Sequence, residues 1–187
     1  MTFDIKQLVL TVIDMQNGFL GQRSQHVLPA VVKLVQEFRR RRLPVIFTRF
    51  HNLQGSQYER LIGWRRLRSS PEIDLSPELQ QYADIVIDKE IYSAFTPLFE
   101  ETVKRHNWQN IVLCGVATDG CVLKTAVDAF ERGLTPIVVT DACASHAGED
   151  VHKAGLLLLE RFIGKNQLMN MDTLLAGIDA QAVSSVG

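Results

Sequence analysis

The chain has 187 residues, 46% of them hydrophobic and 22% charged, which predicts one globular domain spanning residues 1–187. Twenty basic and 21 acidic side chains give a net charge of −1, so we expect a small-molecule partner and neither nucleic acid nor a membrane. Three cysteines without a disulfide pattern, and an N-terminus unlike an export signal, predict reduced thiols in a cytoplasmic protein.

Short β-branched or apolar runs recur along the chain at the spacing of buried parallel strands. We expect strands at 8–13, 45–50, 85–87, 111–113 and 137–139, with a short sixth strand at 168–169. Between them, apolar residues from Leu28 to Phe38 recur at helical intervals and predict a helix packed on the sheet. Thr96 and Pro97 have the properties of an N-cap and a first helical residue, so a second helix should run to about His106.

A third helix is expected from about Gly120 to Gly133, a glycine suited to the left-handed C-terminal position. Its spacing places three apolar side chains inward and three polar ones outward, namely Val122, Ala126 and Phe130 against Lys124, Asp128 and Glu131. A fourth helix covers 149–161, and its run at 156–159 is apolar on more faces than one sheet contact uses. That surplus predicts a homodimer or a higher homo-oligomer.

Strands that alternate with helices indicate one doubly wound, Rossmann-like α/β domain with helices on both faces. In such folds, ligands bind beyond the carboxyl ends of the strands. Asp14 follows the first strand, Lys89 follows the third and Cys121 lies just past the fourth, so all three should share one rim. The long segment at 51–77 has little periodicity, which is typical of a functional loop.

Cys121 ends the sequence GVATDGC, where a strand leads through glycines into a helix. An isolated cysteine is usually a small buried hydrophobe, and that interpretation stands for Cys114 and Cys143. At a helix N-terminus, however, free N–H groups and the helix dipole favour the thiolate of Cys121 and can bind an oxyanion. We therefore interpret Cys121 as a candidate nucleophile.

Asp14 alone is a weak signal, because a carboxylate at a strand end is usually a cap or a surface charge. An aspartyl-phosphate enzyme would need a second acid where Gln16 stands, and a dinucleotide site needs more glycines than Gly18. No cofactor is expected. Lys89 beside Asp14 would hold the carboxylate charged and supply positive potential during catalysis. Replacing Lys89 by Met should cut turnover and affect folding little.

Four motifs carry a specific resemblance: DMQNGF at 14–19, KEIYSAF at 89–95, GVATDGCVLKTA at 115–126 and VTDACAS at 139–145. Over nearly its whole length the chain resembles the isochorismatase-like cysteine hydrolases. The resemblance implies a six-stranded, mainly parallel sheet of order 3-2-1-4-5-6. It also implies that Cys121 attacks a carbonyl to form a thioester, that Asp14 carries the proton and that Lys89 supports Asp14. The peptide between Val116 and Ala117 should be cis, directing the N–H groups of Ala117 and Cys121 at the oxyanion.

The chain departs from its metal-holding relatives, the nicotinamidases, which carry an Asp-x-His pair after the second strand. Arg49 and His51 occupy those places, and a cationic guanidinium opposes a metal, so we expect none. Relatives that cleave the vinyl ether of isochorismate need no cysteine nucleophile, so Cys121 favours a small amide, carbamoyl or ureido substrate. Isochorismatase-type hydrolysis and a catalytically silent binding module remain as alternatives.

Six residues are candidates for substrate contact: Gln16, Phe19, His51, Trp64, Tyr92 and Thr118. Four arginines are either carboxylate binders or solvated charges, namely Arg49, Arg65, Arg66 and Arg68. Two further interpretations stay open. His146 could be the base for Cys121. Alternatively, Cys121 could be a redox sensor that pairs with Cys114 or Cys143.

Overall fold

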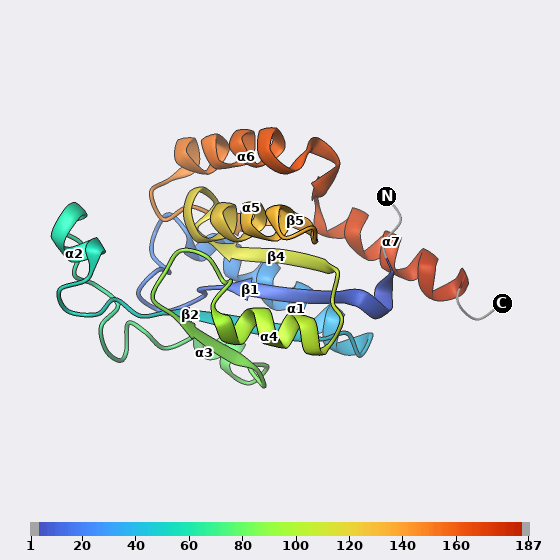
Figure 1. Cartoon of the computed structure of the whole chain (residues 1–187), viewed down its shortest axis with the longest axis horizontal. Helices are drawn as coiled ribbons and strands as arrows, with labels where there is room; N and C mark the ends of the chain where they lie inside the picture. The colour runs from blue at the N-terminus through green and yellow to red at the C-terminus, as the bar shows by residue number, and fades with distance from the viewer. Residues whose placement is uncertain (1–3, 185–187) are drawn as a thin grey trace.

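Strand β1 (Leu8–Ile13) lies at the centre of a six-stranded parallel sheet in the computed structural model, which describes residues 4–184. The strand order is β3-β2-β1-β4-β5-β6, so the expected order 3-2-1-4-5-6 is confirmed. The other strands are β2 (Val45–Phe50), β3 (Val86–Lys89), β4 (Asn110–Val116), β5 (Thr135–Ala144) and β6 (Leu168–Met169). Figure 1 shows that the segment carrying α2 (Gln57–Ile62) lies beyond one end of the strands.

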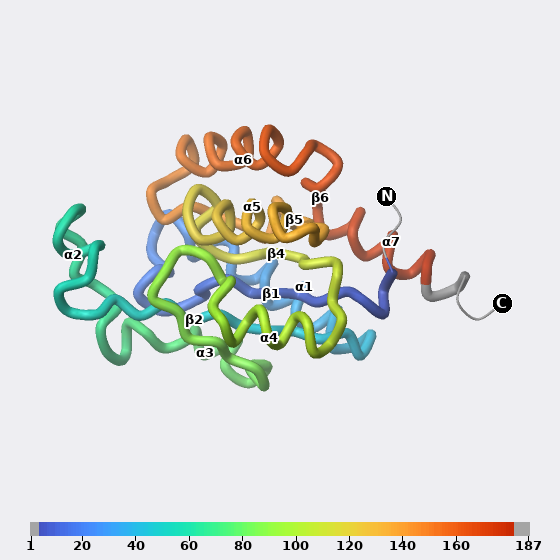
Figure 2. The backbone as a smooth tube through the Cα atoms, in the orientation of Figure 1, coloured from blue at the N-terminus to red at the C-terminus, as the bar shows by residue number. Residues whose placement is uncertain are grey.

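Helices cover both faces of the sheet, as expected for a doubly wound domain (Figures 1 and 2). Helices α1 (Leu28–Arg40) and α7 (Met171–Ser184) lie on one face. Helices α4 (Pro97–Arg105), α5 (Leu123–Glu131) and α6 (Glu149–Ile163) lie on the other. The shorter elements are η1 (Ile5–Gln7), η2 (Gln25–Val27), α3 (Pro77–Gln80), the π-helical turn η3 (Thr118–Val122) and η4 (Lys165–Gln167).

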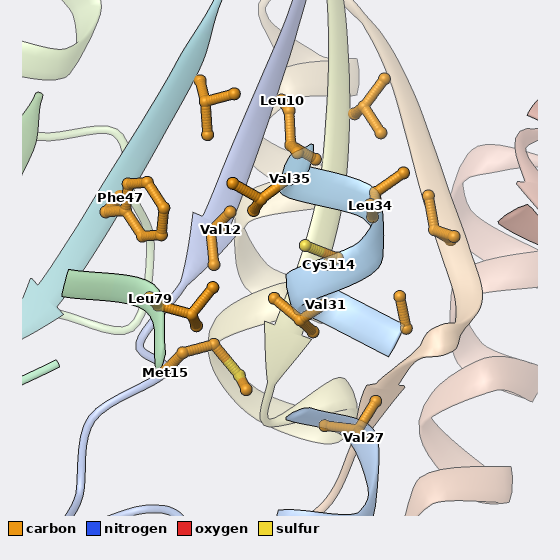
Figure 3. Close-up of a cluster of buried hydrophobic side chains, with 14 of the residues drawn as sticks. Leu10, Val12, Met15, Val27, Val31, Leu34, Val35, Phe47, Leu79 and Cys114 are labelled. Atoms are coloured by element: carbon orange, nitrogen blue, oxygen red, sulfur yellow. The ribbon is translucent and has the colours of Figure 1, made fainter. Parts of the chain in front are cut away.

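Alternate residues of β1 enter two separate hydrophobic cores because successive side chains of a strand point to opposite faces. Leu10 and Val12 pack beneath α1, whereas Val9 and Ile13 pack beneath α4 and α5. Figure 3 shows Cys114 among the side chains beneath α1. Burying each large apolar side chain contributes about 1.5–3 kcal/mol, so these cores hold the strand ends in fixed positions.

The helix predicted to begin after Thr96 has the expected boundaries. The Thr96 hydroxyl accepts a hydrogen bond from the Phe99 N–H at 3.3 Å, and α4 ends before His106. Three strands extend beyond the predicted runs, which places Lys89 at the end of β3 and not after it. Helix α7 and the short helix α2 were not predicted, because neither shows a clear amphipathic pattern.

The predicted facing of the third helix was wrong at two residues. Phe130 is 53% exposed because eight residues past Val122 an α-helix has turned about 80° beyond the starting face, whereas Ala129 returns to it. Asp128 is buried and not outward, because Lys124 and Arg132 lie one turn away on either side and pair with its carboxylate.

No helix within residues 4–184 combines the length and the apolar character that crossing a bilayer requires.

Candidate active site

Cys121 lies in the turn η3, directly after β4 and before α5. Gly115 permits this exit, because its φ of 110° suits glycine and an added Cβ would collide with the Ile13 carbonyl oxygen of β1. The peptide between Val116 and Ala117 is cis, as the family resemblance implies. On α6, Gly155 allows close packing, since a Cβ there would lie 2.9 Å from the Asp119 nitrogen. These contacts fix the turn that carries the thiol.

Asp14 ends β1 in a left-handed conformation, with a φ of 49°, and is fully buried. Its carboxylate accepts a 2.7 Å hydrogen bond from the hydroxyl of Thr48 on the neighbouring strand β2. The Asp14 N–H in turn donates to the same hydroxyl oxygen at 3.2 Å. Thr48 therefore fixes both the backbone and the side chain of Asp14.

Lys89 joins the two groups. Its Nζ lies 2.7 Å from Asp14 Oδ2 and donates a hydrogen bond to Cys121 Sγ at 3.4 Å. Two further hydrogen bonds from Nζ reach the carbonyl oxygens of Ile91 and Tyr92, at 3.0 and 3.1 Å. The side chains of Lys89 and Asp14 are both 0% exposed, so the ion pair is shielded from water. The three residues expected on one rim thus form one buried cluster in which Lys89 contacts both Asp14 and Cys121.

Electrostatics in this cluster correct the expectation of a resting thiolate. Burial raises the pKa of the Cys121 thiol well above its ordinary value, and the negative Asp14 raises it further, which together outweigh the opposing effect of Lys89. Burial lowers the pKa of Lys89, but the neighbouring Asp14 carboxylate and Cys121 sulfur more than compensate, so the pKa is raised. At neutral pH the cluster therefore holds a neutral thiol beside an ammonium group.

Cys121 opens onto a cavity of about 760 Å³. Much of its wall is aromatic, formed by Phe19, Phe50, Tyr58, Trp64, Tyr92 and Phe162. The rings contact one another. The centroid of the Tyr58 ring lies 5.0 Å from that of Phe50 and 5.1 Å from that of Tyr92. Phe19 stacks on Trp64 with the two centroids 5.7 Å apart. Three of the six predicted contact residues, Phe19, Trp64 and Tyr92, therefore line the cavity beside the thiol.

The other three predicted contact residues, Gln16, His51 and Thr118, are not among the lining residues of this cavity. Gln16 is fully buried and bonds the backbone of Phe50 and Ile73. His51 directs Nε2 at Asp88, 3.0 Å away. The Thr118 hydroxyl lies 2.7 Å from His152 Nδ1. All three hold loops in place around the site.

Thr48, Phe50 and Tyr58 are among the residues of the site that were missed at the sequence level. Phe50 lies 5.2 Å below the Lys89 ammonium group, and its place at the end of β2 was a usable signal. Tyr58 reaches the cavity from α2, and burial raises its pKa to about 12, so its hydroxyl stays protonated.

Two other interpretations of Cys121 were left open: His146 as its base, and a redox role in which Cys121 pairs with Cys114 or Cys143. His146 lines the same cavity, and its ring is tilted against Phe19 with centroids 5.3 Å apart. Lys89, however, donates a hydrogen bond to the thiol, and the charge of Asp14 acts on the thiol pKa. Cys114 packs in the core beneath α1, on the opposite face of the sheet from Cys121. Cys143 shares the face of Cys121, and its Sγ points to the Leu113 carbonyl oxygen at 4.0 Å.

Arg49 and His51, which stand where the sequence analysis looked for a metal-binding pair, do not fit a cation. Arg49 forms a bidentate ion pair with Asp88, with bonds of 2.7 and 3.0 Å, and His51 contacts the same carboxylate. Within residues 4–184, no three His, Cys, Asp or Glu side chains gather in an arrangement that could hold a metal ion. The Arg49 guanidinium neutralises Asp88 and has no acceptor atom with which to hold a metal ion.

The fold and the buried cluster define a doubly wound α/β protein with an acid, a lysine and a cysteine at the carboxyl edge of its sheet. The chain belongs to the isochorismatase family, whose domain model matches residues 8–167. It is 31% identical over 184 residues to the uncharacterized isochorismatase family protein YwoC of Bacillus subtilis. The aligned region covers 89% of this chain and 93% of YwoC.

Nicotinamidase 3 of Arabidopsis thaliana is 30% identical over 162 residues, or 82% of this chain and 81% of the relative. Among solved structures, a cysteine hydrolase from Pseudomonas syringae pv. phaseolicola superimposes with a TM-score of 0.84 over 96% of both chains, at 21% identity. The likeness to that structure confirms the fold.

Proposed function

We propose that this protein is a cysteine-dependent hydrolase that cleaves the C–N bond of a small amide, carbamoyl or ureido compound. One observation carries the proposal: Lys89 Nζ lies 2.7 Å from Asp14 and 3.4 Å from Cys121, at the inner end of a cavity that admits a small molecule. The similarity to a nicotinamidase, a relative named for hydrolysing an amide, supports the same chemistry.

In the first half of the reaction, Cys121 Sγ attacks the substrate carbonyl carbon while its proton passes to the Asp14 carboxylate. A neutral thiol with a raised pKa requires such a base at the moment of attack, and Asp14 is the carboxylate that Lys89 links to the thiol in the buried cluster. Collapse of the tetrahedral intermediate breaks the C–N bond. The leaving nitrogen takes the proton from Asp14, and a thioester remains on Cys121.

In the second half, Asp14 accepts a proton from a water molecule whose oxygen attacks the thioester carbon. The C–S bond then breaks, the sulfur regains the proton and the acid product leaves. Lys89 stabilises the negative charge as it moves between Asp14 and the sulfur, because its ammonium group contacts both atoms. We assign the oxyanion to the N–H groups of Ala117 and Cys121, which lie on either side of residues 118–120 in the turn η3.

The test is a broad panel of primary amides, N-carbamoyl compounds and ureido compounds, with release of ammonia or amine as the readout. Wild type should hydrolyse at least one class, and Cys121→Ala should not. Cys143→Ala is the matched control, because that thiol is equally buried but does not line the cavity. His146→Ala should retain most activity. Full activity in Cys121→Ala, or wild-type turnover of a vinyl ether and of no amide, would contradict the proposal.

A further inference from the structure

The cavity that contains Cys121 is incompletely covered on the side that α2 and α6 border. Ile62 of α2 and Phe162 of α6 line the cavity, yet these residues are 63% and 47% exposed. The wall also includes Leu123 and Val127 of α5, which are only partly buried. In a single chain these apolar side chains face water, so the outer part of the cavity lacks a cover.

Helices α5 and α6 lie side by side on one face of the sheet, and each exposes a row of apolar side chains (Figure 1). The rows recur at intervals of three and four residues, so each follows one side of its helix. Three of the residues also line the cavity, which makes the rows continuous with the catalytic site. We call these six residues the α5–α6 patch: Leu123, Val127 and Phe130 on α5, and Leu157, Leu158 and Phe162 on α6.

The size of the α5–α6 patch matches the apolar part of a protein interface. Its six residues expose roughly 500 Å², counting about 200 Å² for each fully exposed large apolar residue. A standard interface buries about 800 Å² per partner, somewhat more than half of it nonpolar. Exposed apolar patches of this size on a soluble domain usually mark a binding surface.

The charges on the patch suit a second copy of the same chain. Lys124 and Glu131 lie seven residues apart on α5, so they stand on one side of the helix about 10 Å apart, with Val127 between them. Both side chains are exposed, and Glu131 makes no ion pair within residues 4–184. If two α5 helices pack antiparallel, each Lys124 faces Glu131 of the partner subunit. Asp128, which pairs with Lys124 in the single chain, then retains Arg132.

We propose that two copies of this chain pack through the α5–α6 patch about a twofold axis near Val127, and that the second copy covers the outer part of the catalytic cavity. Such a contact is self-complementary, as a twofold axis requires. Because Val127 lies on the cavity wall, Val127 of the partner subunit becomes part of that wall. The dimer itself is independent of the proposed hydrolysis, whereas its effect on turnover rests on that function.

Leu158→Glu tests the interface without altering a residue that lines the cavity. Sedimentation and light scattering should find a wild-type dimer at micromolar concentration. The variant should dissociate at least about 100-fold more readily, because each dimer would bury two unpaired carboxylates. Leu98→Glu is the matched control, since Leu98 is 54% exposed on α4 and lies outside the patch, so this variant should remain a dimer. A monomeric wild type, or a dimer that tolerates Leu158→Glu, would overturn the interface.

A charge exchange tests the antiparallel arrangement. Lys124→Glu and Glu131→Lys should each weaken the dimer, because each places like charges opposite one another across the axis. The combination Lys124→Glu/Glu131→Lys re-forms both pairs with their signs reversed and should restore dimerisation to within about 3-fold of wild type. Association is the only readout here, since Lys124 lines the cavity. Additive weakening in the double variant would contradict the proposed axis.

Two measurements test whether the second copy covers the cavity. At concentrations where Leu158→Glu is monomeric but folded by circular dichroism, its kcat/KM for the best amide should be at least about 10-fold lower, and should recover as rising protein concentration restores the dimer. Independently of turnover, a bulky dye maleimide should label Cys121 at least about 3-fold faster in this monomer than in the wild-type dimer. A monomeric variant with wild-type labelling would contradict the cover. Wild-type protein that hydrolyses no amide would contradict only the catalytic proposal, because association and labelling need no turnover.

Discussion

Replacing Lys89 by Met removes the cation from a buried ion pair and leaves Asp14 unpaired. From its place near the rim alone, the substitution was expected to change folding little. The structure changes that expectation, because both side chains are 0% exposed and water cannot take over the role of the ammonium group. Lys89→Met should therefore reduce stability as well as turnover.

The size of the effect follows from the geometry of the pair. Two unit charges 2.7 Å apart attract by about 6 kcal/mol at an effective dielectric constant of ~20, and desolvation offsets part of this. Removing one partner of a buried pair typically costs about 3–5 kcal/mol, against a total unfolding free energy of roughly 5–15 kcal/mol. Turnover of the folded fraction should fall by about 100-fold to 10,000-fold, because Lys89 contacts both the base and the nucleophile.

Urea unfolding followed by circular dichroism measures the stability loss, and activity is assayed where the variant remains folded. The double variant Asp14→Asn/Lys89→Met removes both charges. Its unfolding free energy should therefore exceed that of Lys89→Met by at least about 2 kcal/mol, while it remains inactive. Lys153→Met is the matched control. Its ion pair with Glu149 is 64% exposed on both sides, and such surface pairs contribute about 0–1 kcal/mol.

An unfolding free energy for Lys89→Met within about 1 kcal/mol of wild type would refute the buried ion pair. A double variant less stable than the single one would show that Lys89 stabilises the fold through packing of its stem and not through charge.

Three further predictions concern other residues. Thr48→Val should lower kcat about 10-fold or more at nearly constant KM, because it strips the hydroxyl that orients Asp14, and Thr48→Ser should restore most of the rate. Peptide mapping by mass spectrometry after brief iodoacetamide treatment should find Cys121 modified before the other two cysteines, because it alone lines the cavity. Its labelling should become faster as the pH rises, because its pKa is raised; equal labelling of all three cysteines would contradict the nucleophile assignment. Light scattering should find a dimer or larger assembly that Leu157→Glu weakens, because Leu157 and Phe162 leave apolar surface exposed on α6; a monomeric wild type would contradict this.

The arrangement of Asp14, Lys89 and Cys121 could be predicted because it depends only on topology. Parallel strands bring their carboxyl ends to one edge, and each of the three residues lies at or just after such an end. The role of Thr48 depends on register as well. Its hydroxyl contacts Asp14 because β2 pairs with β1 in the register that places Phe47 beside Val12. That register cannot be predicted from the sequence of either strand alone.

Other features were beyond the sequence because they depend on burial and on the path of the chain. The helix N-terminus correctly singled out Cys121 as the cysteine in contact with an acid and a cation, yet it predicted the wrong direction for the thiol pKa. Desolvation, which no sequence pattern reports, outweighs the dipole. Tyr58 was missed because its short helix lies within an aperiodic segment. The contacts of Tyr58 with Phe50 and Tyr92 depend on how that segment folds back onto the sheet, which the sequence does not indicate.

The cavity divides its tasks between two parts of the chain that are physically tied together. The reacting groups stand on strand ends, whereas Tyr58 and Trp64 of the aromatic wall come from the segment at 51–77. Gln16, two residues after Asp14, bonds the backbone of Phe50 and of Ile73 at 2.7–2.9 Å and so clamps both ends of that segment to the sheet. Because the clamp is backbone-directed, side chains inside the segment can change without disturbing it. Substrate choice can therefore diverge within this family while the geometry of the buried cluster stays constant.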